Sequence, residues 1–118
     1  MKEKQITVLI VKPNRPARIE TINNNLQTFQ RLVGGYIEHI RQDGYDIIIN
    51  EEGKLINLEP NFAIYGGQDF IAGVAIFVGI DYMRGDCKSL TDEQIKGISQ
   101  SFKRRGPING KTNQTPKA

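Results

Sequence analysis

The stretch FIAGVAIFVGI, residues 70–80, decides how this chain folds, because it is almost wholly apolar. It is too short to cross a bilayer as a helix, which takes about 20 residues. A continuous apolar run of this length is typical of a strand that is covered on both faces of its sheet. We therefore expect residues 70–80 to form the central, buried strand of the domain.

A second strand is expected near the N-terminus, where residues 6–11 read ITVLIV and are apolar on both faces. Residues 13–16, PNRP, carry a strong turn signal. Apolar and polar side chains then alternate over residues 17–22, as in a half-exposed strand. We expect these two strands to pair as a hairpin.

The strongest turn signal is the pair Asp43-Gly44, which favours a type I′ turn with positive φ at both central residues. Two β-rich segments flank this turn, at residues 36–42 and 45–50. The turn fixes their register, so that Arg41 lies opposite Asp46. Another tight connection leads into residues 54–58, which we expect to complete a three-stranded meander.

The first of two expected helices covers residues 25–33. Asn24 and Gln27 have the spacing of a capping pair, and apolar residues recur behind them at helical intervals. The pair Gly34-Gly35 supplies a C-terminal stop signal. We therefore expect a short amphipathic helix that ends at the glycines.

The second expected helix follows a hydrophobic staple and a capping box, formed by Leu90, Thr91, Gln94 and Ile95. Its apolar residues Ile95, Ile98 and Phe102 lie on one face. The helix is expected to end at residues 103–105, KRR, because cations suit the negative end of the helix dipole.

These elements predict one α+β domain over residues 1–105, with an antiparallel-rich sheet of five or six strands and two helices packed on one face of it. Residues 106–118 are polar, glycine-containing and proline-containing, and we interpret them as a disordered basic tail. The central strand and the small number of helices leave sheet surface to be covered. We therefore expect a homodimer.

The net charge of +3 suggests binding to nucleic acid, but its distribution does not, because the positive charge is concentrated in the tail. Residues 103–118 hold five basic residues and no acidic one, so residues 1–102 carry 11 basic against 13 acidic groups. Surfaces that follow a phosphate backbone need basic stripes. We expect no specific nucleic-acid partner, no membrane partner and, since no signal peptide pattern is present, a cytoplasmic protein.

The sequence lacks the motifs of the common enzyme classes: no Walker loop, GxGxxG, HExxH, GxSxG or CxxC occurs. One cysteine and one histidine are too few for a zinc site. His39 is interpreted as a structural residue, with a general base as the alternative, and Cys87 as an inert thiol rather than a nucleophile. We expect no catalytic residue, no cofactor and no metal, hence a binding protein and not an enzyme.

Polar and aromatic residues at strand ends and in the longest loop are the candidates for a ligand site. Arginines that could hold a phosphate group complete the set. The predicted ligand-binding residues are Tyr36, Arg41, Asn50, Asn61, Tyr65, Gln68 and Arg84. Arg15, Arg18 and Arg31 are further cations that could converge on such a pocket.

Four blocks of this sequence carry a family resemblance: LVGGYIEHI (32–40), NEEGKLINLEPN (50–61), DFIAGVAIFVG (69–79) and SLTDEQI (89–95). In this order and spacing they resemble domain-of-unknown-function family 3846, over roughly residues 6–102. The family has no catalytic motif to transfer. The resemblance therefore implies a setting, on phages and other mobile elements, and no chemistry.

In that setting, small binding proteins often counter host defence. The resemblance thus implies an anti-defence sponge that sequesters a small phosphorylated nucleotide signal, which requires arginines and aromatic rings in one pocket. The alternative is a protein–protein interaction module that inhibits or docks to a host defence protein through a sheet face or an exposed edge.

Overall fold

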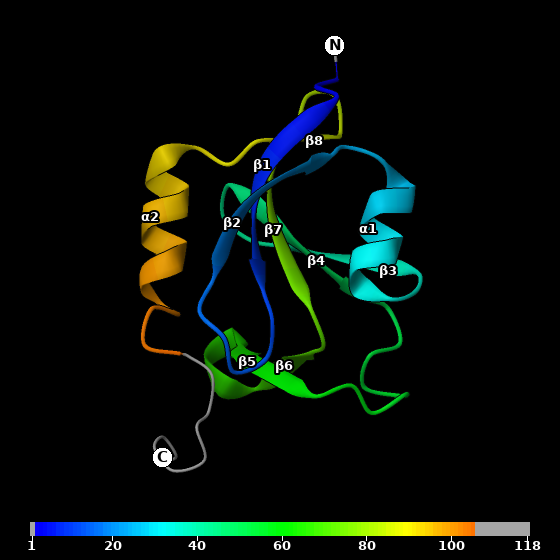
Figure 1. Ribbon diagram of the computed structural model, residues 1–118, viewed down its shortest axis with the longest axis vertical. Helices are drawn as coiled ribbons and strands as arrows, with labels where there is room; N and C mark the ends of the chain where they lie inside the picture. The colour runs from blue at the N-terminus through cyan, green and yellow to red at the C-terminus, as the bar shows by residue number, and fades with distance from the viewer. Residues whose placement is uncertain (1, 106–118) are drawn as a thin grey trace.

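The computed structural model describes residues 2–105, which are built around a six-stranded antiparallel sheet (Figure 1). Five of its strands follow the order β2-β1-β7-β4-β3, and the short β8 also pairs with β7. The strands of this sheet are β1 (Gln5–Val11), β2 (Arg18–Asn23), β3 (Ile37–Arg41), β4 (Tyr45–Asn50), β7 (Ala75–Asp81) and β8 (Asp86–Lys88). The predicted α+β class and the antiparallel sheet are confirmed.

A small second sheet and two helices complete the fold. The second sheet is a hairpin of two strands that are joined by a single 3-10 turn. These elements are β5 (Pro60–Ile64), η1 (Tyr65–Gly67), β6 (Asp69–Ala72), α1 (Leu26–Val33) and α2 (Asp92–Gln100). The predicted tail, residues 106–118, lies outside the described residues.

Strand β7 lies at the centre of the sheet, as predicted, between β1 and β4. Its residues 75–80 are all buried. The predicted single strand over residues 70–80 is wrong in one respect, because it is divided at Gly73. This residue has φ 86°, and a Cβ there would lie 2.7 Å from the Leu58 side chain. The chain therefore turns at Gly73, and the residues before it form β6 in the second sheet.

The β3–β4 hairpin has the predicted register, with Arg41 opposite Asp46. Its turn differs from the expectation, because only Gly44 has positive φ, at 91°, and a type I′ turn also needs positive φ at Asp43. The predicted register is nevertheless present along the whole hairpin, from Ile37 opposite Asn50 to Arg41 opposite Asp46.

The predicted third strand of the meander, residues 54–58, is not a strand. Residues 51–57 form successive turns, closed by backbone hydrogen bonds such as that from Ile56 N to Glu52 O at 3.0 Å. Leu55 is 82% exposed and Ile56 is 53% exposed, so these two apolar side chains are not covered by the rest of the fold. A short apolar run without a surface to cover does not join a sheet.

Both helices begin with a side-chain cap. In α1 the cap is Asn25 and not Asn24, since the Asn24 amide instead donates to the backbone oxygens of Glu3 and Cys87. The predicted stop is confirmed at Gly34, which has a left-handed backbone. In α2 the predicted capping box is confirmed, with the side chains of both partners satisfying backbone N–H groups of the first turn.

The two helices cover opposite faces of the sheet, and the prediction that they pack on one face is wrong (Figure 1). Phe29 and Val33 of α1 pack on the face that carries Ile76. Ile98 of α2 packs on the other face, with Phe77. The central strands are apolar on both sides, so each face needs its own cover, and the β5–β6 hairpin shares the second face with α2.

Candidate functional site

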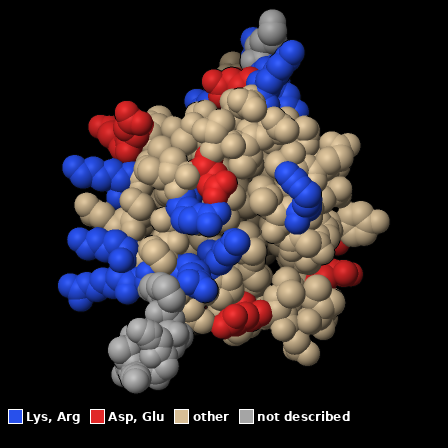
Figure 2. Space-filling model, in the orientation of Figure 1, with Lys and Arg blue, Asp and Glu red and all other residues tan. Residues whose placement is uncertain are grey.

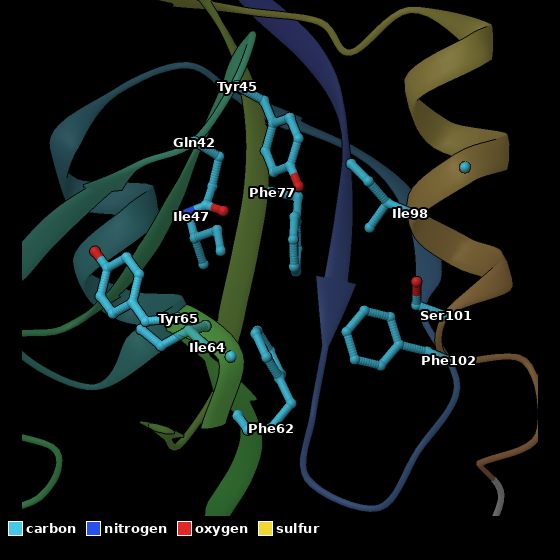
Figure 3. Close-up of a pocket in the computed structure, with 13 residues that line it drawn as sticks. Gln42, Tyr45, Ile47, Phe62, Ile64, Tyr65, Phe77, Ile98, Ser101 and Phe102 are labelled. Atoms are coloured by element: carbon cyan, nitrogen blue, oxygen red, sulfur yellow. The ribbon is translucent and has the colours of Figure 1, made fainter. Parts of the chain in front are cut away.

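A groove of about 660 Å³ lies between α2, the sheet and the β5–η1 segment (Figure 3). The sheet contributes its floor, and Ile98 and Gly97 of α2 contribute one wall. Aromatic side chains dominate the lining, which includes Tyr45, Phe62, Tyr65, Phe77 and Phe102. These residues come from four separate segments of the chain, and only the tertiary fold brings them together.

The aromatic rings pack against one another around Phe77. Its ring centroid lies 5.7 Å from that of Tyr45, 5.8 Å from Phe62 and 6.0 Å from Phe102. Phe62 and Phe102 also meet edge to face, with centroids 5.1 Å apart. Such pairs stabilise one another beyond simple burial. The groove therefore has a floor of fixed shape.

None of the described residues that line the groove is charged. Its polar groups are the Gln42 amide and the hydroxyl groups of Ser101, Tyr45 and Tyr65. Burial, and next the nearby carboxylate of Asp43, raise the pKa of Tyr45, so its phenol stays neutral at physiological pH. The groove thus suits an apolar group with a few neutral hydrogen-bonding atoms.

Gly97 keeps the helical wall of the groove open. A Cβ atom at this position would meet nothing within 4 Å, so no packing constraint requires glycine there. In an exposed helix, glycine costs about 1 kcal/mol relative to alanine. Glycine at this position therefore leaves the wall of the groove open and lowers the stability of the helix relative to alanine.

One of the predicted site residues lines this groove, and another directly precedes a lining residue in the sequence. Tyr65 lines it, with a side chain that is largely exposed. Asn61 directly precedes Phe62, and its amide donates to the backbone oxygens of Val11 and Gly73, both at 2.8 Å. Its Oδ1 accepts a hydrogen bond from Arg105 at 2.9 Å. All polar groups of the Asn61 side chain are thus engaged within the fold.

Three other predicted residues lie elsewhere. Asn50 is buried, and its side chain donates to Val33 O at 3.2 Å and accepts from Glu52 N at 2.7 Å. Tyr36 is 72% exposed before β3, and Gln68 is exposed in the β5–β6 connection. The Asn50 amide therefore ties the end of α1 to β4.

The predicted arginines lie beside the β7–β8 turn. Arg41 places its guanidinium 4.9 Å from the ring centroid of Tyr82, and Arg84 pairs with Asp81 at 3.9 Å. The structure thus spreads the seven predicted residues over several places, and only Tyr65 of them is in the lining of the groove.

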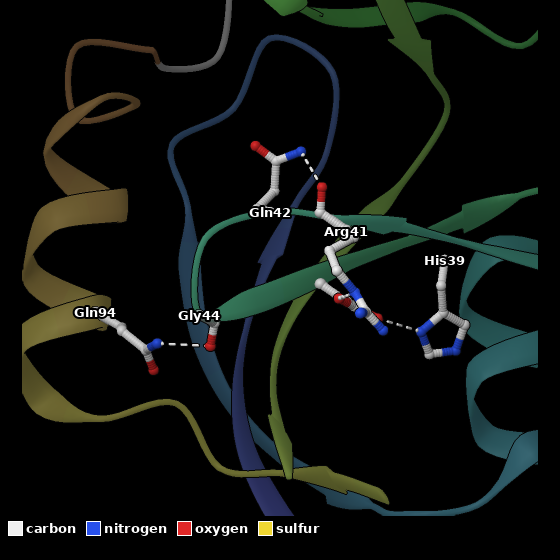
Figure 4. A network of polar contacts seen from close by, with 6 residues as sticks. His39, Arg41, Gln42, Gly44 and Gln94 are labelled. Carbon is white, nitrogen blue, oxygen red and sulfur yellow. Dashed lines mark hydrogen bonds and ion pairs between the residues drawn. The ribbon is translucent and has the colours of Figure 1, made fainter. Parts of the chain in front are cut away.

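A polar network joins the edge strand β3 to β4 (Figure 4). The buried carboxylate of Asp46 lies 2.9 Å from His39 Nδ1 and 3.8 Å from Arg41 Nε. Farther along, the Gln94 side chain donates to Gly44 O at 2.9 Å and ties α2 to the hairpin turn. The carboxylate orients the His39 ring and holds two exposed side chains on the sheet.

The thiol of Cys87 is poorly suited to nucleophilic chemistry. Burial, and next the carboxylate of Asp46, raise its pKa from 9.0 to about 11. The thiolate is the nucleophile, and its fraction at pH 8 should be roughly 100-fold below that of a thiol with the ordinary pKa.

We therefore expect slow alkylation of Cys87 by iodoacetamide at pH 8 in the folded protein and fast alkylation in urea, followed by mass spectrometry. The folded rate should rise as the pH approaches 11. Equal rates in the folded and unfolded protein would contradict this assignment.

A second cavity, of about 470 Å³, is basic and lies at the β1–β2 turn. Lys12, Arg15 and Arg18 line it together with Ile10 and Pro16, and none of these described lining residues is aromatic. Figure 2 shows Lys and Arg side chains gathered over this end of the molecule and beside α2. We call this cavity the basic cleft. Arg18 is paired with Glu20, an exposed contact that offsets part of the charge.

The aromatic groove was not predicted from the sequence. Tyr45, Phe77 and Phe102 have the pattern of core residues, which they also are. Two features of the sequence are compatible with a site but were not part of the prediction: Phe62, an aromatic residue between the expected strands, and Gly97, a glycine on an amphipathic helix. Neither feature specifies a groove without the arrangement of β5 against α2.

Within residues 2–105, no three His, Cys, Asp or Glu side chains lie close enough together to hold a metal ion. None of the helices in this part of the chain has the length and the apolar content needed to cross a membrane.

The fold and the groove define a class: a small α+β domain whose antiparallel sheet carries one helix on each face, with an aromatic groove beneath the second helix. The chain belongs to the family described as domain of unknown function DUF3846, whose model matches residues 6–103. No curated protein and no solved structure matches the chain.

Proposed function

We propose that this protein is a non-enzymatic binding module that docks an apolar segment of a partner protein in the aromatic groove. The observation that carries this proposal is the lining: five aromatic residues and no charged residue around about 660 Å³. Buried aromatic anchors contribute much of the binding energy at protein interfaces. The fixed ring cluster and the open wall at Gly97 provide a preformed receptor for such anchors.

A nucleotide is less suited to this groove, because its phosphate groups require cations or backbone donors. The cations instead line the basic cleft, whose residue Ile10 belongs to the core cluster on the α1 face. The groove belongs to the α2 face, through Phe77. Phosphate-binding groups and stacking rings thus lie on opposite faces of the sheet.

Capture of a small phosphorylated nucleotide is the second candidate function, and the basic cleft is the observation that favours it. Lys12, Arg15 and Arg18 would bind phosphate oxygens, while Pro16 would contact an apolar part of the ligand. Under either proposal, the setting implied by the family resemblance makes host defence the process in which the protein acts for a mobile element.

Peptide binding to the wild type and to variants of the groove tests the first proposal. A library of 12-residue peptides displayed on filamentous phage is selected against the protein and then screened against Gly97→Leu, which fills the groove. Lys96→Leu adds the same side chain to an exposed neighbouring position of α2 and serves as the matched control. We expect apolar peptides that bind the wild type and Lys96→Leu but bind Gly97→Leu at least about tenfold more weakly.

Calorimetric titration with cyclic nucleotides and ADP-ribose derivatives tests the second candidate. Nucleotide binding that is lost in Arg15→Glu and kept in Gly97→Leu, together with no enriched peptide, would replace the groove by the cleft as the functional site. Peptides that bind Gly97→Leu as well as the wild type would also contradict the groove proposal.

A further inference from the structure

We propose, as a refinement that rests on the proposed function, that the groove receives its partner as an added β-strand. This strand pairs antiparallel with β5, places alternate apolar side chains on the aromatic floor, and carries acidic residues at its C-terminal end. The partner is thus an extended segment of another protein, recognised through its backbone as well as its side chains.

The first observation is a free strand edge in the groove. Among the described residues, β5 pairs with β6 alone, so its second edge has no partner strand. Phe62, Ala63 and Ile64 all line the groove although they are consecutive. Side chains of consecutive strand residues point to opposite faces. Three in a row line one cavity when the edge of the strand is turned toward it, and here the lining continues into η1 with Tyr65 and Gly66.

The surroundings of β5 confirm which edge is free. At the start of the strand, Asn61 O accepts a hydrogen bond from Arg105 Nη2, at 2.9 Å, and Arg105 follows α2. On the other side of the hairpin, residues of β6 and Ile64 at the end of β5 line a cavity of about 300 Å³ together with residues of β3 and β4. The paired edge of β5 thus faces β6, and the unpaired edge faces α2 across the groove.

The second observation is the chemistry of the groove walls. A strand added to β5 would direct every second side chain toward Phe77 and the rings around it. On the opposite wall, Gly97 presents no side chain, which leaves room for the backbone of an added strand. Apolar side chains at alternate positions of the partner match this arrangement.

The third observation is positive charge where β5 begins. Arg105 stacks on Phe102 there, with 5.1 Å between the guanidinium carbon and the ring centroid, and Lys103 and Arg104 are exposed beside it. The nearby acidic residue Glu59 is already bonded by the Asn14 amide. Carboxylates of the partner are therefore favoured at this end.

Arg105 also has an unsatisfied donor. Its Nη1 is buried and has no hydrogen-bond partner among the described residues. A buried donor without an acceptor is costly, so a carboxylate brought to this end by an added strand would lower that cost if it accepted from this group. Because β5 runs away from Arg105, an antiparallel strand runs toward it and places its C-terminal end there.

Fluorescence polarisation with synthetic peptides tests the proposal. The probe is an eight-residue labelled peptide with valine, isoleucine and phenylalanine at alternate positions, threonine between them, and two C-terminal aspartates. We expect binding to the full chain that weakens about fivefold or more when the aspartates move to the N-terminal end.

Single backbone N-methylation of this peptide identifies strand pairing. Methylation at every second residue removes a donor from the ladder with β5, and we expect about tenfold weaker binding there. Methylation at the residues between should change the affinity less than about twofold. This alternation is specific for an added strand, because docking through side chains or as a helix does not produce it.

A charge reversal on the protein tests the polarity. The double variant Lys103→Glu and Arg104→Glu should weaken the aspartate peptide about fivefold and favour a peptide with two C-terminal lysines. Lys96→Glu changes charge on the exposed surface of α2 outside the groove lining and is the matched control. Arg105 is left in place because it holds Asn61.

A uniform methylation profile, or no binding of the alternating peptides, would overturn strand addition. The proposed function would still stand if library peptides distinguished Gly97→Leu from Lys96→Leu, and it would fall if they did not. A dimer in light scattering that Gly97→Leu dissociates would also overturn this proposal, because a second copy of the chain would then occupy the groove.

Discussion

Truncation of Phe77 to alanine should lower the free energy of unfolding by about 3–5 kcal/mol, measured by urea denaturation. The side chain is 3% exposed at the centre of the sheet, and it contacts three other rings. The truncation removes these contacts and leaves a cavity that the rigid strands around it cannot close. The aromatic floor of the groove should be lost with it.

Phe70→Ala is the matched control for this truncation. Phe70 lies in β6, is 41% exposed, and its ring contacts the Lys54 ammonium at 4.8 Å. Its removal should cost less than about 1 kcal/mol. If Phe77→Ala cost no more than Phe70→Ala, the ring cluster would not be the packed centre of this face.

The Asn61→Ala variant should lose about 2–4 kcal/mol of stability, because one side chain satisfies three partners. Its amide donates to two backbone oxygens at 2.8 Å, and its Oδ1 accepts from Arg105. Each such hydrogen bond contributes about 0.5–1.5 kcal/mol, and buried groups left without a partner add to the loss. Thermal and urea unfolding both measure it.

Gln68→Ala removes another predicted amide, one that is exposed, and should change the stability by less than about 0.5 kcal/mol. The contrast separates two roles that look alike in a sequence. A loss for Asn61→Ala as small as that for Gln68→Ala would show that Asn61 is free to contact a ligand.

Local patterns predicted those parts of the fold that depend on neighbouring residues. The apolar run around Ile76, the register on either side of Asp43-Gly44 and the capping box at Thr91 are all determined within about a dozen residues. Their physical causes, burial, turn geometry and side-chain capping, act over such distances.

The placement of the helices could not be predicted in the same way. An amphipathic helix shows that one of its faces is buried, but β1 and β7 are apolar on both sides, so either face of the sheet would serve. The sequence also gives no sign of the break at Gly73, because FIAGVAIFVGI has the composition of one continuous strand. Without that break there is no β5–β6 hairpin, and without the hairpin there is no groove.

The ligand-binding residues could not be identified from the sequence. The sequence shows that an amide or a guanidinium group is present, but it does not show whether that group bonds within the protein or binds a partner. Asn50 and Asn61 satisfy backbone groups inside the protein, and Arg41 pairs with Asp46. Only the three-dimensional arrangement distinguishes such residues from those with free polar atoms.

The position of Gly97 separates the selectivity of the groove from the stability of the fold. It borders the cavity but contributes nothing to the core, since the space for a Cβ is empty. A larger residue there changes the width of the groove while improving the helix. Most proteins lose stability when a binding surface is altered, or lose binding when they are stabilised. At this position, successive substitutions from alanine to leucine could instead retune the range of accepted side chains in a domain that stays folded throughout.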